Sequence, residues 1–118
     1  MPSKLAHLIA TEEGFYEKGT LPQRNHNPGD LRHSPHSQHP GDPNDIGVIA
    51  SDADGWEDLE RQLRLYADRG LTLSQAIYEW APPTDNNDTP KYLFDVVQGF
   101  GGAVTSETPL TKVLEILA

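Results

Sequence analysis

Residues 3–16 of the chain read SKLAHLIATEEGFY. Apolar side chains recur at helical spacing in this stretch, and one face carries Leu5, Leu8, Ile9 and Tyr16. Ser3 has a side chain suited to accept a hydrogen bond from the free N–H groups of a first helical turn. The stretch therefore predicts an amphipathic helix over residues 3–13, which Gly14 ends.

Two further helices are predicted directly after residue 51. Asp52 or Asp54 is suited to cap the first of them, and Gly70 is suited to end it. Its apolar residues follow one another at intervals of three or four positions: Trp56, Leu59, Leu63 and Tyr66. Thr72 is suited to cap the second helix, and Pro82 and Pro83 are expected to end it. One side of this helix carries Leu73, Ile77 and Trp80.

The last two helices are predicted from cap and proline signals. Residues 86–90 read NNDTP, which offers a cap and a proline at the first helical position. The helix that follows has an apolar face of Tyr92, Leu93, Val96 and Val97. Thr108 and Pro109 begin a final helix, in which we expect these side chains to point inward: Leu110, Val113, Leu114 and Leu117.

Residues 17–51 have no helical period and are rich in turn-forming residues. Residues 46–50 are suited to one short strand, which we expect to pair with residues 30–33. The predicted fold class is therefore mainly α. We expect one domain over residues 1–118, with about five helices and a long irregular loop or small β-hairpin after the first.

Composition limits the classes of partner. The 118 residues carry 18 acidic and 9 basic side chains, for a net charge of -9, and no cysteine. Nucleic acids and anionic membranes bind clustered Lys and Arg, so we expect neither as a partner, and we expect a monomer. No apolar run is long enough for a signal peptide or a membrane span. We therefore expect synthesis in the cytoplasm without a signal peptide.

Glu12 and Glu13 stand at the end of the first predicted helix, followed by a glycine and two aromatic residues. A glutamate that is partly buried beside aromatic rings has a raised pKa and can donate a proton near neutral pH, as cleavage of a glycosidic bond requires. A helical wheel places Glu12 inside the apolar face and Glu13 at its edge, where a general acid can meet a substrate. The alternative is a solvated helix end without chemistry.

Four histidines lie in the irregular segment, at positions 26, 33, 36 and 39. The spacing of the last three is compatible with a metal site. However, Pro35 and Pro40 interrupt any helix that would align them, so a solvated loop explains them better. We expect neither a metal site nor another cofactor.

Two amide-rich clusters are suited to sugars. Residues 23–27 read QRNHN, and residues 86–87 are a pair of asparagines. Planar amide and guanidinium groups are typical hydrogen-bond partners of sugar hydroxyl and acetamido groups. Ordinary helix capping explains Asn87 equally well.

Taken in order, several motifs resemble those of phage-type lysozymes and lysozyme-like proteins of bacterial mobile elements. Residues 13–16, EGFY, resemble the Glu-Gly-aromatic motif that ends the first helix of that family. Residues 23–31, QRNHNPGDL, resemble its Arg-Asn-Asn-Asn-Pro-Gly stretch, and residues 49–55 resemble its strand and the glycine entering the next helix. Residues 80–83, WAPP, followed by residues 87–89, NDT, and by Tyr92, resemble its Trp-Ala-Pro-Pro…Glu-Asn-Asp-Thr…Tyr signature. The likeness covers most of residues 5–97.

The resemblance implies a lysozyme-like fold that cleaves the β-1,4 MurNAc-GlcNAc bond of peptidoglycan, with Glu13 as general acid. It implies that the substrate-binding residues are Gln23, Asn25, Asn27, Asp30, Asn87 and Tyr92. It also implies action at the bacterial cell wall or as part of a virion. Two positions depart from the family pattern: His26 replaces an asparagine, and Asp85 stands where a glutamate is common.

The mechanism depends on a second carboxylate, for which Asp30 and Asp45 are the candidates. With such a group near Glu13 the reaction is hydrolysis. Without one, the resemblance implies a lytic transglycosylase, in which the sugar's own 6-hydroxyl attacks, and the single glutamate among amides favours this outcome. A glycan-binding module without activity and a phage structural component on the same fold are the alternatives, and the net charge of -9 favours the binding module.

Overall fold

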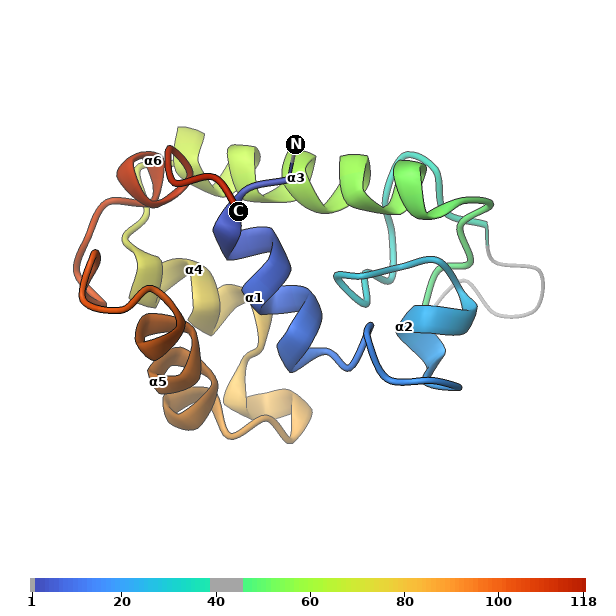
Figure 1. Ribbon diagram of the computed structural model, residues 1–118, viewed down its shortest axis with the longest axis horizontal. Coiled ribbons are helices and arrows are strands. Elements are labelled where there is room, and N and C mark those ends of the chain that lie inside the picture. Colours follow the sequence, from blue (N-terminus) through green and yellow to red (C-terminus); the bar gives the residue numbers. More distant parts are fainter. Residues whose placement is uncertain (1, 39–45) are drawn as a thin grey trace.

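The computed structural model describes residues 2–38 and 46–118. In these residues the chain forms six α-helices and one 3₁₀ turn, with isolated β-bridges as the only strand-like pairing (Figure 1). The elements are α1 (Lys4–Glu12), α2 (Leu21–Arg24), α3 (Asp52–Asp68), α4 (Leu73–Trp80), the 3₁₀ turn η1 (Pro83–Asp85), α5 (Thr89–Gly99) and α6 (Leu110–Val113). The predicted mainly α class is confirmed.

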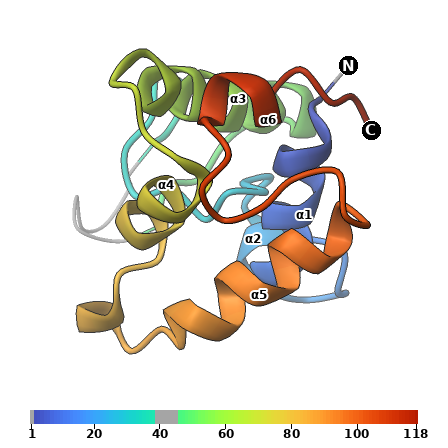
Figure 2. The same ribbon diagram turned by 90° about the vertical axis from the view of Figure 1, so that its left-hand side faces the viewer.

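Helix α1 occupies the centre of the arrangement, in contact with α3 on one side and α5 on the other. In Figure 2, α3 and α6 lie at one end of the molecule and α5 at the other, with α1 and α4 between them. Residues from all five of these helices form one hydrophobic cluster. Its largest fully buried members are Leu5, Ile9, Leu59, Leu63, Leu73, Ile77, Leu110, Val96 and Val113.

Helix starts agree closely with the sequence signals. The Ser3 side chain caps α1, and Thr72 forms a capping box with Gln75 at the start of α4. Asp88 caps α5, with Pro90 in the first turn. Helix α3 differs in its cap, because the Ser51 hydroxyl, and not Asp52 or Asp54, accepts the hydrogen bond from the first turn.

Two predictions about the helices are wrong. Residues 21–24 form the short helix α2, whose cap is Thr20 and whose first turn contains Pro22. Such a four-residue helix is too short to show an apolar period. At the other end, α6 stops at Val113 and Leu117 is 63% exposed, because the chain leaves the helix and pairs Leu117 with Ser3 in an antiparallel bridge.

The Asn27 side chain organises the loop between α2 and α3. It is fully buried, and its amide nitrogen donates to the carbonyl oxygens of Leu31 (2.8 Å) and Gly47 (2.9 Å). Its amide oxygen accepts from the N–H of Leu31 at 3.0 Å. These three hydrogen bonds satisfy backbone groups that have no partner in a helix or sheet, because the loop forms neither.

The predicted hairpin is present only in part. The N–H of Gly47 donates to the carbonyl of Leu31, as pairing with residues 30–33 requires, but the antiparallel bridge joins Val48 to Gln38. Residues 39–45, which include the candidate carboxylate Asp45 and the histidine at position 39, lie outside the described residues. In the described part of the chain, no helix is long and apolar enough to cross a membrane.

Helix α3 approaches this loop so closely that position 55 has no room for a side chain. A Cβ atom on Gly55 would lie 2.1 Å from the carbonyl oxygen of His26 and 2.8 Å from Cδ of Pro28. Both atoms belong to a tight turn, so neither can swing aside.

We expect Gly55→Ala to lower the free energy of unfolding by about 2 kcal/mol or more, although alanine favours helices over glycine by about 1 kcal/mol. Chemical denaturation measures the change. Gly99→Ala is the control, because its Cβ would meet only the flexible side chain of Leu8, and a smaller loss is expected. Equal effects of the two substitutions would contradict the close approach.

Candidate active site

Glu13 is the residue directly after α1, and its carboxylate is directed into the protein. The Tyr92 hydroxyl donates a hydrogen bond of 2.8 Å to its Oε2 atom, and the Trp80 side chain is near enough to lower the pKa of the carboxyl slightly. Tyr92 is itself 8% exposed and comes from the first turns of α5. The acid is thereby held between the ends of three helices, α1, α4 and α5.

Burial raises the pKa of Glu13 from 4.5 to about 7. The hydrogen bond from Tyr92 opposes this rise because it stabilises the ionised form, whereas the charge of Asp30 adds to it. Burial and the neighbouring Glu13 also raise the pKa of the Tyr92 phenol, so this group remains a neutral donor. The carboxyl is therefore both protonated and ionised in comparable amounts near neutral pH.

A cleft of about 180 Å³ opens beside Glu13. Its walls come from the end of α1, the loop after α2, the end of α4 and the segment around η1. The residues that line it are Glu13, Gly29, Asp30, Arg32, Ile46, Trp80, Ala81, Asp85 and Asn87. Most of these are polar, which suits a hydrogen-bonding ligand such as a sugar.

Asp30 brings a second carboxylate to this cleft. It has a left-handed backbone, with φ at 53°, at the end of the turn that Asn27 begins, and its N–H donates to the Asn27 carbonyl. Burial raises the pKa of Asp30, and Arg32 opposes the rise. Its Oδ1 atom is buried without a hydrogen-bond partner among the described residues. A buried acceptor of this kind is available to a ligand or a water molecule.

Gly29 allows the Trp80 ring to pack against the loop. A Cβ atom at position 29 would lie 2.9 Å from Cζ2 of Trp80 and 3.1 Å from Cδ1 of Leu59. The same indole ring lines the cleft beside Glu13, so the turn at residues 27–30 and the acid both lie next to Trp80.

The structure brings together four of the seven residues that the sequence predicted for the site. Glu13, Asp30 and Asn87 line the cleft, and Tyr92 bonds to the acid. Asn27 is fully buried and bonded to the backbone, so it shapes the loop and has no surface for a sugar. Gln23 accepts a hydrogen bond from the N–H of Gly19. Among the described residues that line the cleft, neither Gln23 nor Asn25 is present.

The helical wheel is wrong about Glu12. Its side chain is exposed, whereas Glu13 is the more buried of the pair. The reason is that the buried face of α1 consists of Leu5, Ala6, Ile9 and Ala10, whereas Leu8 is only partly buried. Glu13 lies one helical turn after Ile9, to whose carbonyl its N–H donates, and so continues this face. Trp80, Asp85 and Arg32 were not predicted as site residues. Trp80 and Asp85 belong to segment 80–92, whose likeness to a lysozyme motif could have indicated them as site residues. No sequence motif pointed to Arg32.

Two of the loop histidines meet carboxylates of α3. His26 Nδ1 lies 2.7 Å from Asp52, and His36 Nδ1 lies 2.6 Å from the buried Asp58. The hydrogen bond to Asp58 raises the pKa of His36. These contacts fasten the irregular segment to the first half of the helix.

Comparisons with protein-family models, with curated proteins and with solved structures find no match to this chain.

The raised pKa of Glu13 predicts how stability depends on pH. Between pH 4.5 and 7 the folded state holds the Glu13 proton more firmly than the unfolded state, so the free energy of unfolding falls as the pH rises through this window. The full loss is at most about 3 kcal/mol. Glu13→Gln keeps the size of the side chain and removes the charge, and we expect it to be more stable than the parent at pH 8 but not at pH 4.

Denaturant titrations across this pH range measure the difference. Glu17→Gln, which changes an exposed carboxylate near the same helix end, is the control and should follow the parent protein at every pH. A constant difference between Glu13→Gln and the parent would contradict the raised pKa.

Proposed function

We propose that this protein cleaves the β-1,4 MurNAc-GlcNAc bond of peptidoglycan glycan strands, with Glu13 as the general acid. The observation that carries the proposal is a half-buried glutamate with a pKa of about 7, on a polar cleft that holds a second carboxylate. The likeness of its motifs to those of phage-type lysozymes supports the same reaction. The proposed site of action is the bacterial cell wall, either free or as part of a virion.

In the proposed reaction, Glu13 gives its proton to the glycosidic oxygen as the bond to the anomeric carbon breaks. The leaving sugar thereby departs as a neutral alcohol, and positive charge develops on the remaining ring. Tyr92 then stabilises the Glu13 carboxylate that proton transfer creates, since its hydroxyl donates a hydrogen bond to it.

Asp30 is the proposed partner of the acid. An ionised Asp30 offsets the positive charge of the sugar and accepts a proton from the attacking water, for which its unpartnered Oδ1 is available. This second carboxylate on the cleft favours hydrolysis over the transglycosylase route. Asn87 and Asp85 supply hydrogen-bonding groups at the opposite wall.

The first test is turbidity clearing of purified bacterial cell walls. We expect Glu13→Gln to lower the rate by about a thousandfold, within the range typical of a lost general acid, while its circular dichroism stays that of the parent. Glu12→Gln, the neighbouring exposed carboxylate, is the matched control and should retain activity.

Product masses then distinguish the two routes of cleavage. Hydrolysis leaves a reducing sugar end, whereas the transglycosylase route leaves a 1,6-anhydro end that is lighter by one water. Binding of walls by the parent protein without any cleavage would replace the enzyme proposal with the glycan-binding one. Equal clearing by Glu13→Gln and the parent would remove Glu13 from the mechanism.

The pH dependence of activity offers a second test. Because Glu13 must be protonated to act as an acid, activity should fall as the pH rises through about 7. Tyr92 lowers this pKa through its hydrogen bond, so Tyr92→Phe should move the alkaline limb upward by roughly one pH unit. Tyr78→Phe, at an exposed tyrosine of α4, is the control. A limb that does not move would show that another group titrates.

A further inference from the structure

The His36 imidazole is oriented by the buried carboxylate of Asp58. Asp58 is 1% exposed and accepts from the His36 N–H (2.9 Å), from the Ser34 hydroxyl (2.6 Å) and from the imidazole Nδ1 (2.6 Å). Since a carboxylate only accepts hydrogen bonds, Nδ1 carries the hydrogen. The other ring nitrogen, Nε2, is therefore the one left for a ligand.

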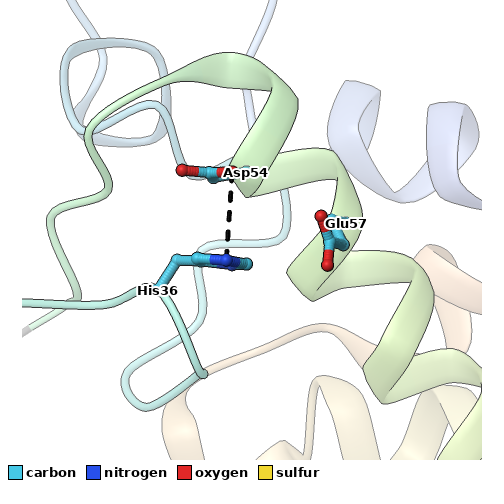
Figure 3. Close-up of side chains that lie close together, drawn as sticks. All are labelled: His36, Asp54 and Glu57. Atoms are coloured by element: carbon cyan, nitrogen blue, oxygen red, sulfur yellow. Dashed lines mark ion pairs between the residues drawn. The ribbon is translucent and has the colours of Figure 1, made fainter.

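Nε2 of His36 faces two more carboxylates of α3. It lies 3.9 Å from Oδ1 of Asp54, and Glu57 is beside them on the next turn of the helix (Figure 3). One ligand atom from each of His36, Asp54 and Glu57 lies within 4.8 Å of the other two. Asp54 and Glu57 are three residues apart, so they project from the same face of α3.

We propose that His36, Asp54 and Glu57 form a binding site for a divalent first-row transition metal ion, with Zn²⁺ as the best match. One imidazole nitrogen and two carboxylate oxygens are ligands that Zn²⁺ accepts, and three protein ligands leave a fourth position for water. All three side chains are at least partly exposed, so an ion can reach them from solvent.

The feature that separates this site from an ordinary surface ion pair is Asp58. Histidine ligands of metals usually donate their other ring N–H to a carboxylate or carbonyl, which fixes the ring and its tautomer. Here the partner is the buried carboxylate of Asp58, which also accepts a hydrogen bond from the backbone N–H of His36. Three carboxylates around one imidazole also leave excess negative charge, which a dication offsets.

A bound ion would join the turn at residues 34–37 to the first two turns of α3. The same loop carries Asp30 and the Asn27 hydrogen bonds, so metal binding would restrict the segment that forms one wall of the cleft. The proposal does not depend on cleavage of peptidoglycan, and its test uses binding alone.

The test is calorimetric titration of the tag-free, metal-free protein with Zn²⁺, followed by ¹⁵N NMR of the His36 ring. We expect one ion per chain and a shift of the Nε2 resonance. Glu57→Gln removes an exposed ligand and should weaken binding about tenfold or more, as should Asp54→Asn. Asp68→Asn changes the charge of α3 equally, at its other end, and should leave the affinity unaltered.

Thermal unfolding gives a readout that does not depend on heat of binding. Zn²⁺ should raise the midpoint of the parent and of Asp68→Asn, and raise that of Glu57→Gln less. The proposal is overturned if Zn²⁺ does not bind, if Glu57→Gln and Asp54→Asn bind it as tightly as the parent, or if the Nε2 resonance of His36 stays in place. In those cases the cluster is an ion pair only.

Discussion

The buried Asn27 amide is the interaction on which the irregular half of the molecule depends. Between α2 and α3 the described residues contain one bridge and no strand, so most backbone groups there lack a regular partner. Asn27 satisfies three of them from a single side chain. It thereby sets the turn at whose end Asp30 takes its left-handed backbone and faces the cleft. An aspartate at position 27 has no N–H to donate to the two carbonyls, and a glutamine places its amide one carbon too far away.

The sequence predicts the helical half well because its signals are local. Ser3, Thr72 and Asp88 cap helices by accepting hydrogen bonds from N–H groups three residues along the chain, so each signal lies within one helical turn. The loop could not be predicted in the same way. The contact of Gly55 with the His26 carbonyl and the bond of Ser34 to Asp58 join residues more than twenty positions apart. Nothing in either local pattern indicates its partner.

The candidate site illustrates the same division. The sequence singles out Glu13, yet its helical wheel assigns the wrong member of the pair to the apolar face, because that face was drawn through Leu8, whereas Leu5, Ala6, Ile9 and Ala10 are the buried residues of α1. The resemblance to phage-type lysozymes includes Tyr92, but only the fold brings its hydroxyl to a glutamate 79 positions away. Asn27 shows the opposite case, in which a polar residue suited to a sugar is used inside the protein. Residue type alone does not distinguish a ligand contact from an internal one.

The charge of the molecule is compatible with chemistry in the cleft because burial acts on the acid more strongly than the field of its neighbours. With a net charge of -9, an ionised Glu13 beside Asp30 adds to an existing excess of negative charge. Protonation of Glu13 removes that cost and at the same time produces the form that donates a proton. Burial raises the pKa of both carboxyls, but the neighbouring charges act in opposite directions: Asp30 adds to the rise at Glu13, whereas Arg32 opposes the rise at Asp30. Opposed neighbouring charges of this kind favour the protonated form of Glu13 and the ionised form of Asp30, as the proposed reaction requires.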